Sequence, residues 1–221
     1  MNKVKKPCTR KQRALLRLVI LLPLLALLVL SRRYGFTPEH ALREVEEMTG
    51  TGPTQVIREL GSLPVGTKER KMALAANDNA MLLFARQFGL GNGWESGGYS
   101  VLDCSTDERI HTASWQPSCR NGEEKTVAVY FFGRVDDPEI EELSIRLVWP
   151  EAGSEGRTDW NKTLGQEDWF TWNGHTYFLA SHSFPGRWNE DYGIGMTLQA
   201  RDGAGIWTEV GFQHWTASYL N

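Results

Sequence analysis

Short signatures of well-known enzyme chemistry are missing from this sequence. It has no Gly-x-Ser-x-Gly, no His-Glu-x-x-His, no glycine loop followed by Lys-Ser or Lys-Thr, and no Ser-x-x-Lys beside suitable partners. The five histidines, at positions 40, 111, 175, 182 and 214, are dispersed along the chain. A lone histidine is more often a turn residue with its hydrogen bonds satisfied than a general base. The sequence therefore predicts no catalytic residue and no cofactor.

Cysteine is also scarce, with three residues in the chain. There is no second close cysteine pair, and the nearest histidine, His111, is alone, so no metal site is expected. Cys104 and Cys119 lie fifteen positions apart. In an oxidising compartment, a disulfide between them would contribute roughly 3 kcal/mol by closing this loop. The alternative is two free thiols.

Acidic residues are absent from the first 33 positions, which hold nine of the 24 lysines and arginines. Seven of these basic residues precede the apolar run Leu18–Leu30. The positive-inside rule leaves the basic end in the cytoplasm and sends the chain after Arg33 across the membrane. Positions 14 to 30 form about 26 Å of helix, near the lower limit for a crossing. We expect a basic cytoplasmic tail at 1–13 and a transmembrane anchor at 14–31, which binds the lipid bilayer.

A cleaved secretory signal is the alternative to an anchor. Val29 and Ser31 could serve as the small residues before a cleavage site, but Arg32 and Arg33 follow at once. Either interpretation exports the rest of the chain. The expected location is the cell membrane, with a single pass and an extracytoplasmic C-terminal domain, and the alternative is secretion.

The chain beyond position 33 is acidic, with 15 basic residues against 27 acidic ones. Its basic residues are scattered, whereas nucleic acid requires a clustered cationic surface. We therefore expect no nucleic-acid partner. The basic cluster at the start is better explained by the anionic inner leaflet of the membrane.

An amphipathic helix and a linker are predicted over 34–54. Thr37 suits the N-cap and Pro38 the first helical position, and Gly50 and Gly52 end the pattern. Short apolar runs separated by turn residues then predict strands, and no helical pattern follows Met48. These strands are expected near 56–60, 70–76, 80–88, 99–102, 126–135, 143–147, 196–200 and 206–212.

Two of the strand patterns are more specific. The run Thr126–Val135 is almost continuously apolar, which is typical of an inner strand. Asn173-Gly174 is the preferred two-residue hairpin turn, and it should place Trp172 opposite His175, Phe170 opposite Tyr177 and Trp169 opposite Phe178. The expected fold class is mostly β: an antiparallel β-sandwich or a partly open barrel. We expect it to divide into an N-terminal β module at 55–122 and a C-terminal β-sandwich module at 123–221.

The order of basic tail, anchor and β-rich segments resembles uncharacterised single-pass membrane-anchored extracytoplasmic proteins of Gram-positive bacteria. The resemblance is carried by short motifs: Thr37-Pro38-Glu39-x-Ala41-Leu42, Val127-x-Val129-Tyr-x-Phe-Gly-x-Val-Asp-Asp-Pro-x-Ile140 and Leu198-x-Ala200-x-Asp202-x-x-Gly205. It implies that the turn Val135-Asp-Asp-Pro138 precedes strands that complete a small sandwich. It implies no catalytic residues.

The loop at 182–192 is the candidate ligand-binding segment. Trp188 and Tyr192 stand there among Arg187 and Asp191. An aromatic platform beside polar groups can stack on a sugar ring and bind its hydroxyls. Trp94, in another glycine-rich loop, has the same status. The alternative is that these aromatics close the core of a small β-domain.

Two functions follow from this pattern. The first is a membrane-anchored β-domain that binds cell-wall glycan or an envelope protein without chemistry of its own. The alternative is an envelope glycan hydrolase that uses carboxylates from separate loops, which would have to face each other across a cleft. Adjacent pairs such as Asp136-Asp137 point to opposite faces of a strand and suit solvated turns better.

Overall fold

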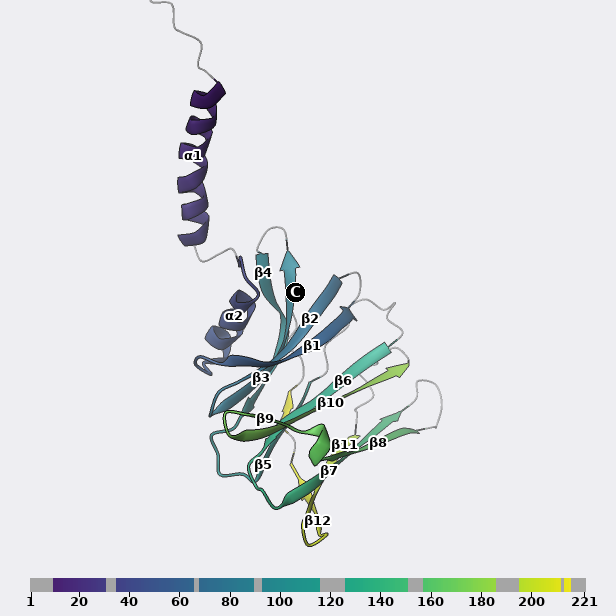
Figure 1. The fold of residues 1–221 in the computed structure, drawn as a ribbon. Coiled ribbons are helices and arrows are strands. Elements are labelled where there is room, and N and C mark those ends of the chain that lie inside the picture. Colours follow the sequence, from purple (N-terminus) through teal and green to yellow (C-terminus); the bar gives the residue numbers. More distant parts are fainter. Residues whose placement is uncertain are drawn as a thin grey trace, which may run out of the picture.

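A computed structural model describes residues 10–30, 35–65, 68–89, 93–115, 126–150, 157–185, 195–211 and 213–215. Helix α1 (Arg10–Leu30) and helix α2 (Glu39–Thr49) precede a β-rich body (Figure 1). The strands are β1 (Gln55–Val65), β2 (Lys68–Ala76), β3 (Ala80–Gly89), β4 (Gly93–Asp103), β5 (Ile110–Trp115), β6 (Thr126–Val135), β7 (Ile140–Pro150), β8 (Arg157–Gly165), β9 (Phe170–Trp172), β10 (His175–Pro185), β11 (Gly195–Asp202), β12 (Trp207–Val210) and β13 (Gln213–Trp215).

Helix α1 exposes its apolar side chains. The large hydrophobic residues from Leu15 to Leu27 that the structure describes are 53% to 67% exposed, and Pro23 lies within the helix. Figure 1 draws this helix apart from the strands. Within the described ranges, no helix combines the length and the apolar character needed to cross a membrane. The anchor at 14–31 stays a prediction.

Helix α2 covers the outer face of the first sheet. Its buried residues Ala41, Leu42 and Val45 pack against β2 and β3, where Leu82 and Phe84 are fully buried. The helix begins at Glu39 with Pro38 as its N-cap, so the predicted N-cap Thr37 lies one residue too early. It ends at Gly50, whose φ of 69° is the left-handed conformation expected of a C-terminal glycine.

Three sheets account for the described strands. Their orders are β1-β2-β3-β4, β13-β5-β6-β10-β9 and β12-β11-β7-β8. Neighbouring strands are antiparallel except β13 and β5, which are parallel. The fold is mostly β, as predicted, and the described strands form no closed barrel. Strands β5 and β6 lie on either side of position 122 and pair from Ile110 with Val135 to Trp115 with Tyr130.

The sheet that contains β6 lies between the other two. Phe131 and Val135 of β6 belong to the core shared with β7 and β11, whereas Tyr130 and Phe132 belong to the core shared with β2 and β3. Alternate side chains of a strand point to opposite faces, so both faces of β6 are covered. The layers run in the order α2, first sheet, central sheet and third sheet. The apolar run Thr126–Val135 is thereby confirmed as an inner strand.

The predicted hairpin is confirmed at its turn. His175 pairs with Trp172 and Tyr177 with Phe170, and Asn173 and Gly174 have φ values of 49° and 82°. Both positive angles belong to the tight hairpin turn that Asn-Gly favours. Trp169 precedes β9 and ends a short 3-10 turn, so the third expected pair, Trp169 with Phe178, is not formed in the ladder.

The structure contradicts the predicted disulfide at Cys104. Cys104 carries a free thiol and is 2% exposed, at the end of the core between the first and central sheets. Its expected partner, Cys119, lies outside the described residues. The side chain of Cys104 is therefore part of the packed core in this structure instead of one end of a bridge.

Candidate functional site

Carboxylate, guanidinium and imidazole side chains meet at the turn between β6 and β7. The backbone N–H groups of Asp136 and Asp137 both donate to the carbonyl of Arg109, at 3.0 and 3.2 Å. The predicted turn at Asp136-Asp137-Pro138 is thus held against the loop that precedes β5. This contact brings residues from the β4–β5 loop, β6 and the β9–β10 hairpin close together.

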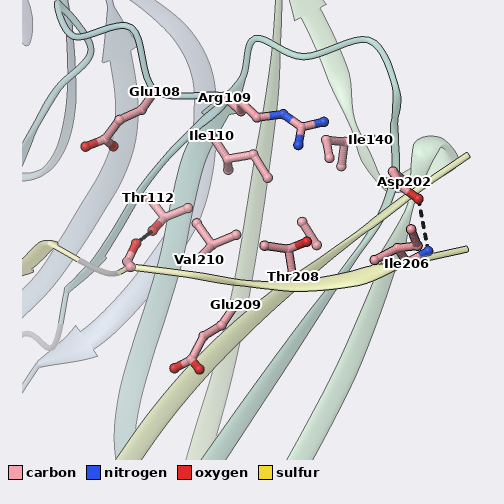
Figure 2. A pocket seen from close by; sticks show the side chains of 12 residues that line it. Glu108, Arg109, Ile110, Thr112, Ile140, Asp202, Ile206, Thr208, Glu209 and Val210 are labelled. Carbon is pink, nitrogen blue, oxygen red and sulfur yellow. Dashed lines mark hydrogen bonds between the residues drawn. The ribbon is translucent and has the colours of Figure 1, made fainter. Parts of the chain in front are cut away.

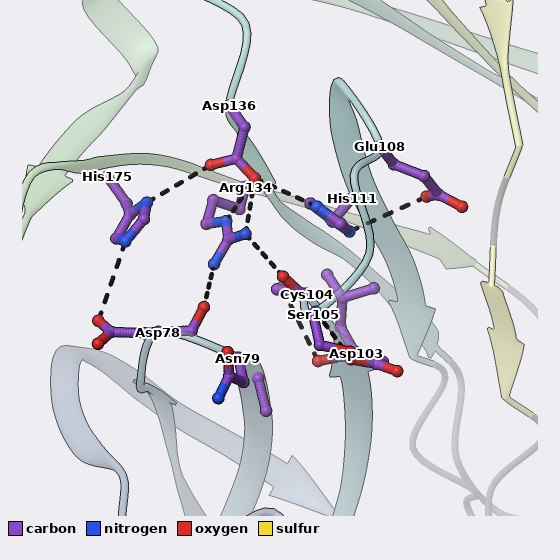
Figure 3. A network of polar contacts seen from close by, with 12 residues as sticks. Asp78, Asn79, Asp103, Cys104, Ser105, Glu108, His111, Arg134, Asp136 and His175 are labelled. Atoms are coloured by element: carbon purple, nitrogen blue, oxygen red, sulfur yellow. Dashed lines mark hydrogen bonds and ion pairs between the residues drawn. The ribbon is translucent and has the colours of Figure 1, made fainter.

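Arg134 is the centre of this polar network (Figure 3). It is 5% exposed, and its Nε donates to Asp136 Oδ2 at 2.8 Å. Its other two nitrogens donate to the carbonyls of Asp78 and Cys104, at 2.6 and 2.7 Å. A buried guanidinium needs such partners for its whole donor fork. One side chain therefore links the β2–β3 turn, the end of β4 and the β6–β7 turn.

Two histidines flank the carboxylate of Asp136. Nε2 of His111 lies 3.2 Å from Oδ2, and Nδ1 of His175 lies 3.5 Å from Oδ1. His111 is 0% exposed, and neither of its ring nitrogens has a partner with hydrogen-bond geometry among the described residues. Its Nδ1 faces Glu108 at 3.9 Å, as Figure 3 shows. Across the described ranges, there is no group of three or more His, Cys, Asp or Glu side chains that could hold a metal ion.

Cys104 and Tyr177 close the network on its core side. Burial raises the pKa of the Cys104 thiol to about 12, and burial also raises the pKa of Tyr177 to about 12. Nucleophilic attack requires the thiolate, which is almost absent near neutral pH at this pKa. The Tyr177 hydroxyl is buried without a hydrogen-bond partner among the described residues. Both groups are structural here.

A polar pocket of about 630 Å³ opens beside the network. Its walls include Asp136 and His175 from the network, together with Gln166, Trp169, Thr171 and Thr176. Carboxylate, imidazole, amide and hydroxyl groups can bind the hydroxyls and amides of a ligand, and an indole offers an apolar wall. We call this the β6–β7 pocket.

A second pocket, of about 420 Å³, shares Ile140 with the first as a wall residue (Figure 2). Its centre is apolar, with Ile110, Ile140 and Val210 among its walls. The hydroxyl of Thr112 donates to the carbonyl of Gly211 at 2.8 Å, where the chain passes from the third sheet to the central one. Figure 2 shows the carboxylates of Glu108 and Glu209 pointing away from this centre.

Two of the carboxylates around the pockets, Asp202 and Asp137, are engaged in local contacts. Asp202 accepts hydrogen bonds from the N–H groups of Ala204 and Ile206, at 3.0 and 2.9 Å. Asp137 accepts one from the N–H of Glu139 at 2.8 Å and pairs with Arg109. The hydrogen bond from Glu139 and, after it, Arg109 hold the pKa of Asp137 below its usual range. Asp137 therefore stays ionised and is a poor general acid.

The structure describes one of the five residues predicted for ligand binding, Trp94. Arg187, Trp188, Asp191 and Tyr192 lie outside the described residues. Trp94 is partly buried at the start of β4, where its ring meets that of Phe88 at a centroid distance of 5.6 Å. It is not among the residues that line either pocket.

Sequence reasoning missed the residues that do line the β6–β7 pocket. Trp169 and His175 stand out in the sequence, but as parts of a hairpin, and Asp136 as part of a turn. Gln166 carries no local signal, because it belongs to a short 3-10 turn after β8. Only the pairing of β6 with β10 brings these segments together.

Comparison with known proteins gives no further guide to this site. No family model matches the chain, and no curated protein and no solved structure matches it.

Proposed function

We propose that this protein is a membrane-anchored extracytoplasmic β-domain that binds a component of the cell envelope without chemistry of its own. The observation that carries the proposal is the β6–β7 pocket, where Asp136, Gln166 and His175 meet beside the indole of Trp169. The ligand that suits these groups is a hydroxyl-rich or N-acetylated sugar of the wall glycan.

The rigidity of the pocket wall supports binding. Asp136 is fixed by Arg134, which is itself tied to two backbone carbonyls, so the carboxylate is oriented before a ligand arrives. His175 is 31% exposed and starts β10 directly after a tight turn. Polar groups held in place in this way lose little conformational freedom on binding, which favours affinity.

The chain before residue 34 supports the anchor. The run Leu18–Leu30 is apolar, seven basic residues precede it, and its described side chains are exposed. A helix that is apolar all round is stable in lipid, where its backbone groups are satisfied internally.

The alternative function, a glycan hydrolase, has less support. Such an enzyme requires a protonated carboxylic acid opposite a second carboxylate, several ångströms apart. Asp137 is held ionised by the backbone N–H of Glu139 and by the guanidinium of Arg109. Asp136 is in contact with Arg134 and two histidines. Asp137 is therefore a poor proton donor to a leaving sugar.

Two measurements on the full chain test the proposal. A reporter that is active only outside the cytoplasm, fused at the C-terminus, should be active, and an inactive reporter would overturn the export. The full chain in detergent should also be retained on isolated wall glycan and be released by soluble glycan fragments. Retention that soluble glycan does not compete would contradict a sugar ligand.

A further inference from the structure

The segment that follows α1 is joined directly to the first sheet. Gly35 and Gly93 form a parallel bridge, and the N–H of Trp94 donates to the carbonyl of Gly35 at 2.7 Å. A Cβ atom at Gly35 would lie 2.2 Å from the carbonyl oxygen of Trp94, and one at Gly93 would lie 2.2 Å from that of Gly35. Only glycine allows the two backbones to approach so closely.

Aromatic side chains are exposed at this junction. Phe36 follows Gly35 and is 51% exposed, and Phe88 is 53% exposed at the end of β3. Trp94 is partly buried and meets Phe88 edge to face. We call Phe36, Phe88 and Trp94 the aromatic rim. Figure 1 draws the β3–β4 end of the first sheet at the same end of the molecule as α1.

The length of chain between α1 and the rim limits their separation. Helix α1 ends at Leu30, and Gly35 already belongs to the first sheet. Five residue steps span at most about 18 Å when fully extended. If α1 lies in the bilayer, the rim must therefore stand close to the membrane surface.

We propose that the aromatic rim is a second membrane contact, seated among the lipid headgroups beside the anchor. The inference rests on the proposed function, because it takes α1 as the anchor. Phe and Trp side chains at the level of the headgroups keep an apolar body in the acyl boundary and, for Trp, an N–H in the wet layer. Contact at the rim would fix the orientation of the β-domain relative to the membrane surface.

The described charges near the rim form no cluster of basic residues. Arg86 pairs with Glu59 at 2.5 Å, and Gln87 donates to Glu95 at 2.9 Å. The Arg86–Glu59 pair is neutral overall, and Gln87 leaves the single negative charge of Glu95 in place, so these described residues form no basic cluster that would select anionic lipid. The rim should therefore bind vesicles of phosphatidylcholine as well as vesicles that contain an anionic lipid.

The experiment uses the full chain reconstituted in phosphatidylcholine vesicles, with acyl chains brominated near the headgroup. Flotation first tests the anchor, since a chain that stays in the soluble fraction contradicts the proposed function and not the rim. In floated protein, the bromines should quench tryptophan fluorescence, and W94F should lose most of that quenching. W207F is the matched control, because Trp207 is 43% exposed in β12 at the far end of the molecule in Figure 1.

A second variant keeps the test decisive if W94F is altered in fold. F88D should float as wild type does, while the quenching of Trp94 falls by at least half because a carboxylate is driven out of the acyl boundary. Equal quenching in the wild type, W94F and F88D would overturn the proposal. So would a rim shielded from both lipid bromine and aqueous acrylamide, since a second copy of the chain would then cover it.

Discussion

Arg134 and Asp136 form the contact on which the candidate site is built. The guanidinium Nε donates to the carboxylate at 2.8 Å, and the same side chain binds the backbone carbonyls of Asp78 and Cys104. Asp136 faces the β6–β7 pocket, whereas Arg134 is 5% exposed. Arg134 thus ties the orientation of the Asp136 carboxylate to the β2–β3 turn and to the end of β4.

Replacing Arg134 by Lys should destabilise the fold by about 3 kcal/mol, because an ammonium cannot reproduce the planar fork and leaves buried carbonyls unpaired. Denaturant unfolding measures the change. R201K is the matched control. Arg201 pairs with Glu142 but is 31% exposed, so R201K should lower the free energy of unfolding by less than about 1 kcal/mol. Equal losses in R134K and R201K would contradict the central place given to Arg134.

Tyr177→Phe should leave the stability at pH 7 unchanged or raise it by up to about 1 kcal/mol, because the buried hydroxyl has no hydrogen-bond partner among the described residues. Burial raises the pKa of Tyr177 to about 12. The unfolded chain therefore ionises first, near pH 10, and the stability falls as the pH rises from 10 to 12, by up to roughly 3 kcal/mol per tyrosine.

The alkaline branch provides the test of Y177F. The wild-type free energy of unfolding should be flat below pH 9 as far as Tyr177 is concerned and should decline above pH 10. Y177F should decline less steeply, with the remaining loss due to Cys104 and Tyr130, whose pKa values burial also raises to about 12. A variant as steep as the wild type would show that Tyr177 is not buried in this way.

Glu46→Ala should cost about 2 to 3 kcal/mol. Its carboxylate is 7% exposed and accepts hydrogen bonds from the N–H and hydroxyl of Thr54, at 2.5 and 2.7 Å. Removing it leaves a buried donor pair unsatisfied where the helix turns into β1. E47A, at the exposed neighbouring position, should change the free energy of unfolding by less than about 0.5 kcal/mol. Similar values for E46A and E47A would refute the buried role of Glu46.

Gly133→Ala should destabilise the fold by about 3 kcal/mol. A Cβ there would lie 2.1 Å from the carbonyl oxygen of His111 and 2.5 Å from the ring of Phe178. Backbone paired in the sheet cannot move aside cheaply. G61A, in β1, meets nothing within 4 Å and should be neutral within about 1 kcal/mol. A thermal melt of each variant measures the difference, and a stable G133A would show that the central sheet is less tightly packed.

The sequence predicted the elements better than their assembly. Local patterns were sufficient for α2, for the Asn173-Gly174 hairpin and for β6, because caps, turn residues and apolar runs act over a few positions. β8 was missed because its sequence is largely polar, with Leu164 its fully buried residue and Trp160 packed partly against the core. Over positions 160–165, where burial is described, this edge strand has one buried residue and so shows little hydrophobic alternation.

The candidate site could not be predicted because its members come from separate strands. His111, Arg134 and His175 are brought together by the pairing of β5 and β10 on either side of β6. The network is a consequence of strand order, which short-range patterns do not encode. Cys104 shows the same limit: the sequence suggested a bridge on spacing and compartment, whereas packing makes it a core residue.

Calorimetric titration of the full chain, in detergent micelles, with the disaccharide of N-acetylglucosamine and N-acetylmuramic acid measures ligand binding at the β6–β7 pocket. We predict saturable binding at one site, lost in H175A and Q166A and unchanged in E209A, which alters the second pocket alone. Binding that is equal in all four proteins would contradict the β6–β7 pocket as the ligand site, and no heat in the wild type would contradict a sugar ligand.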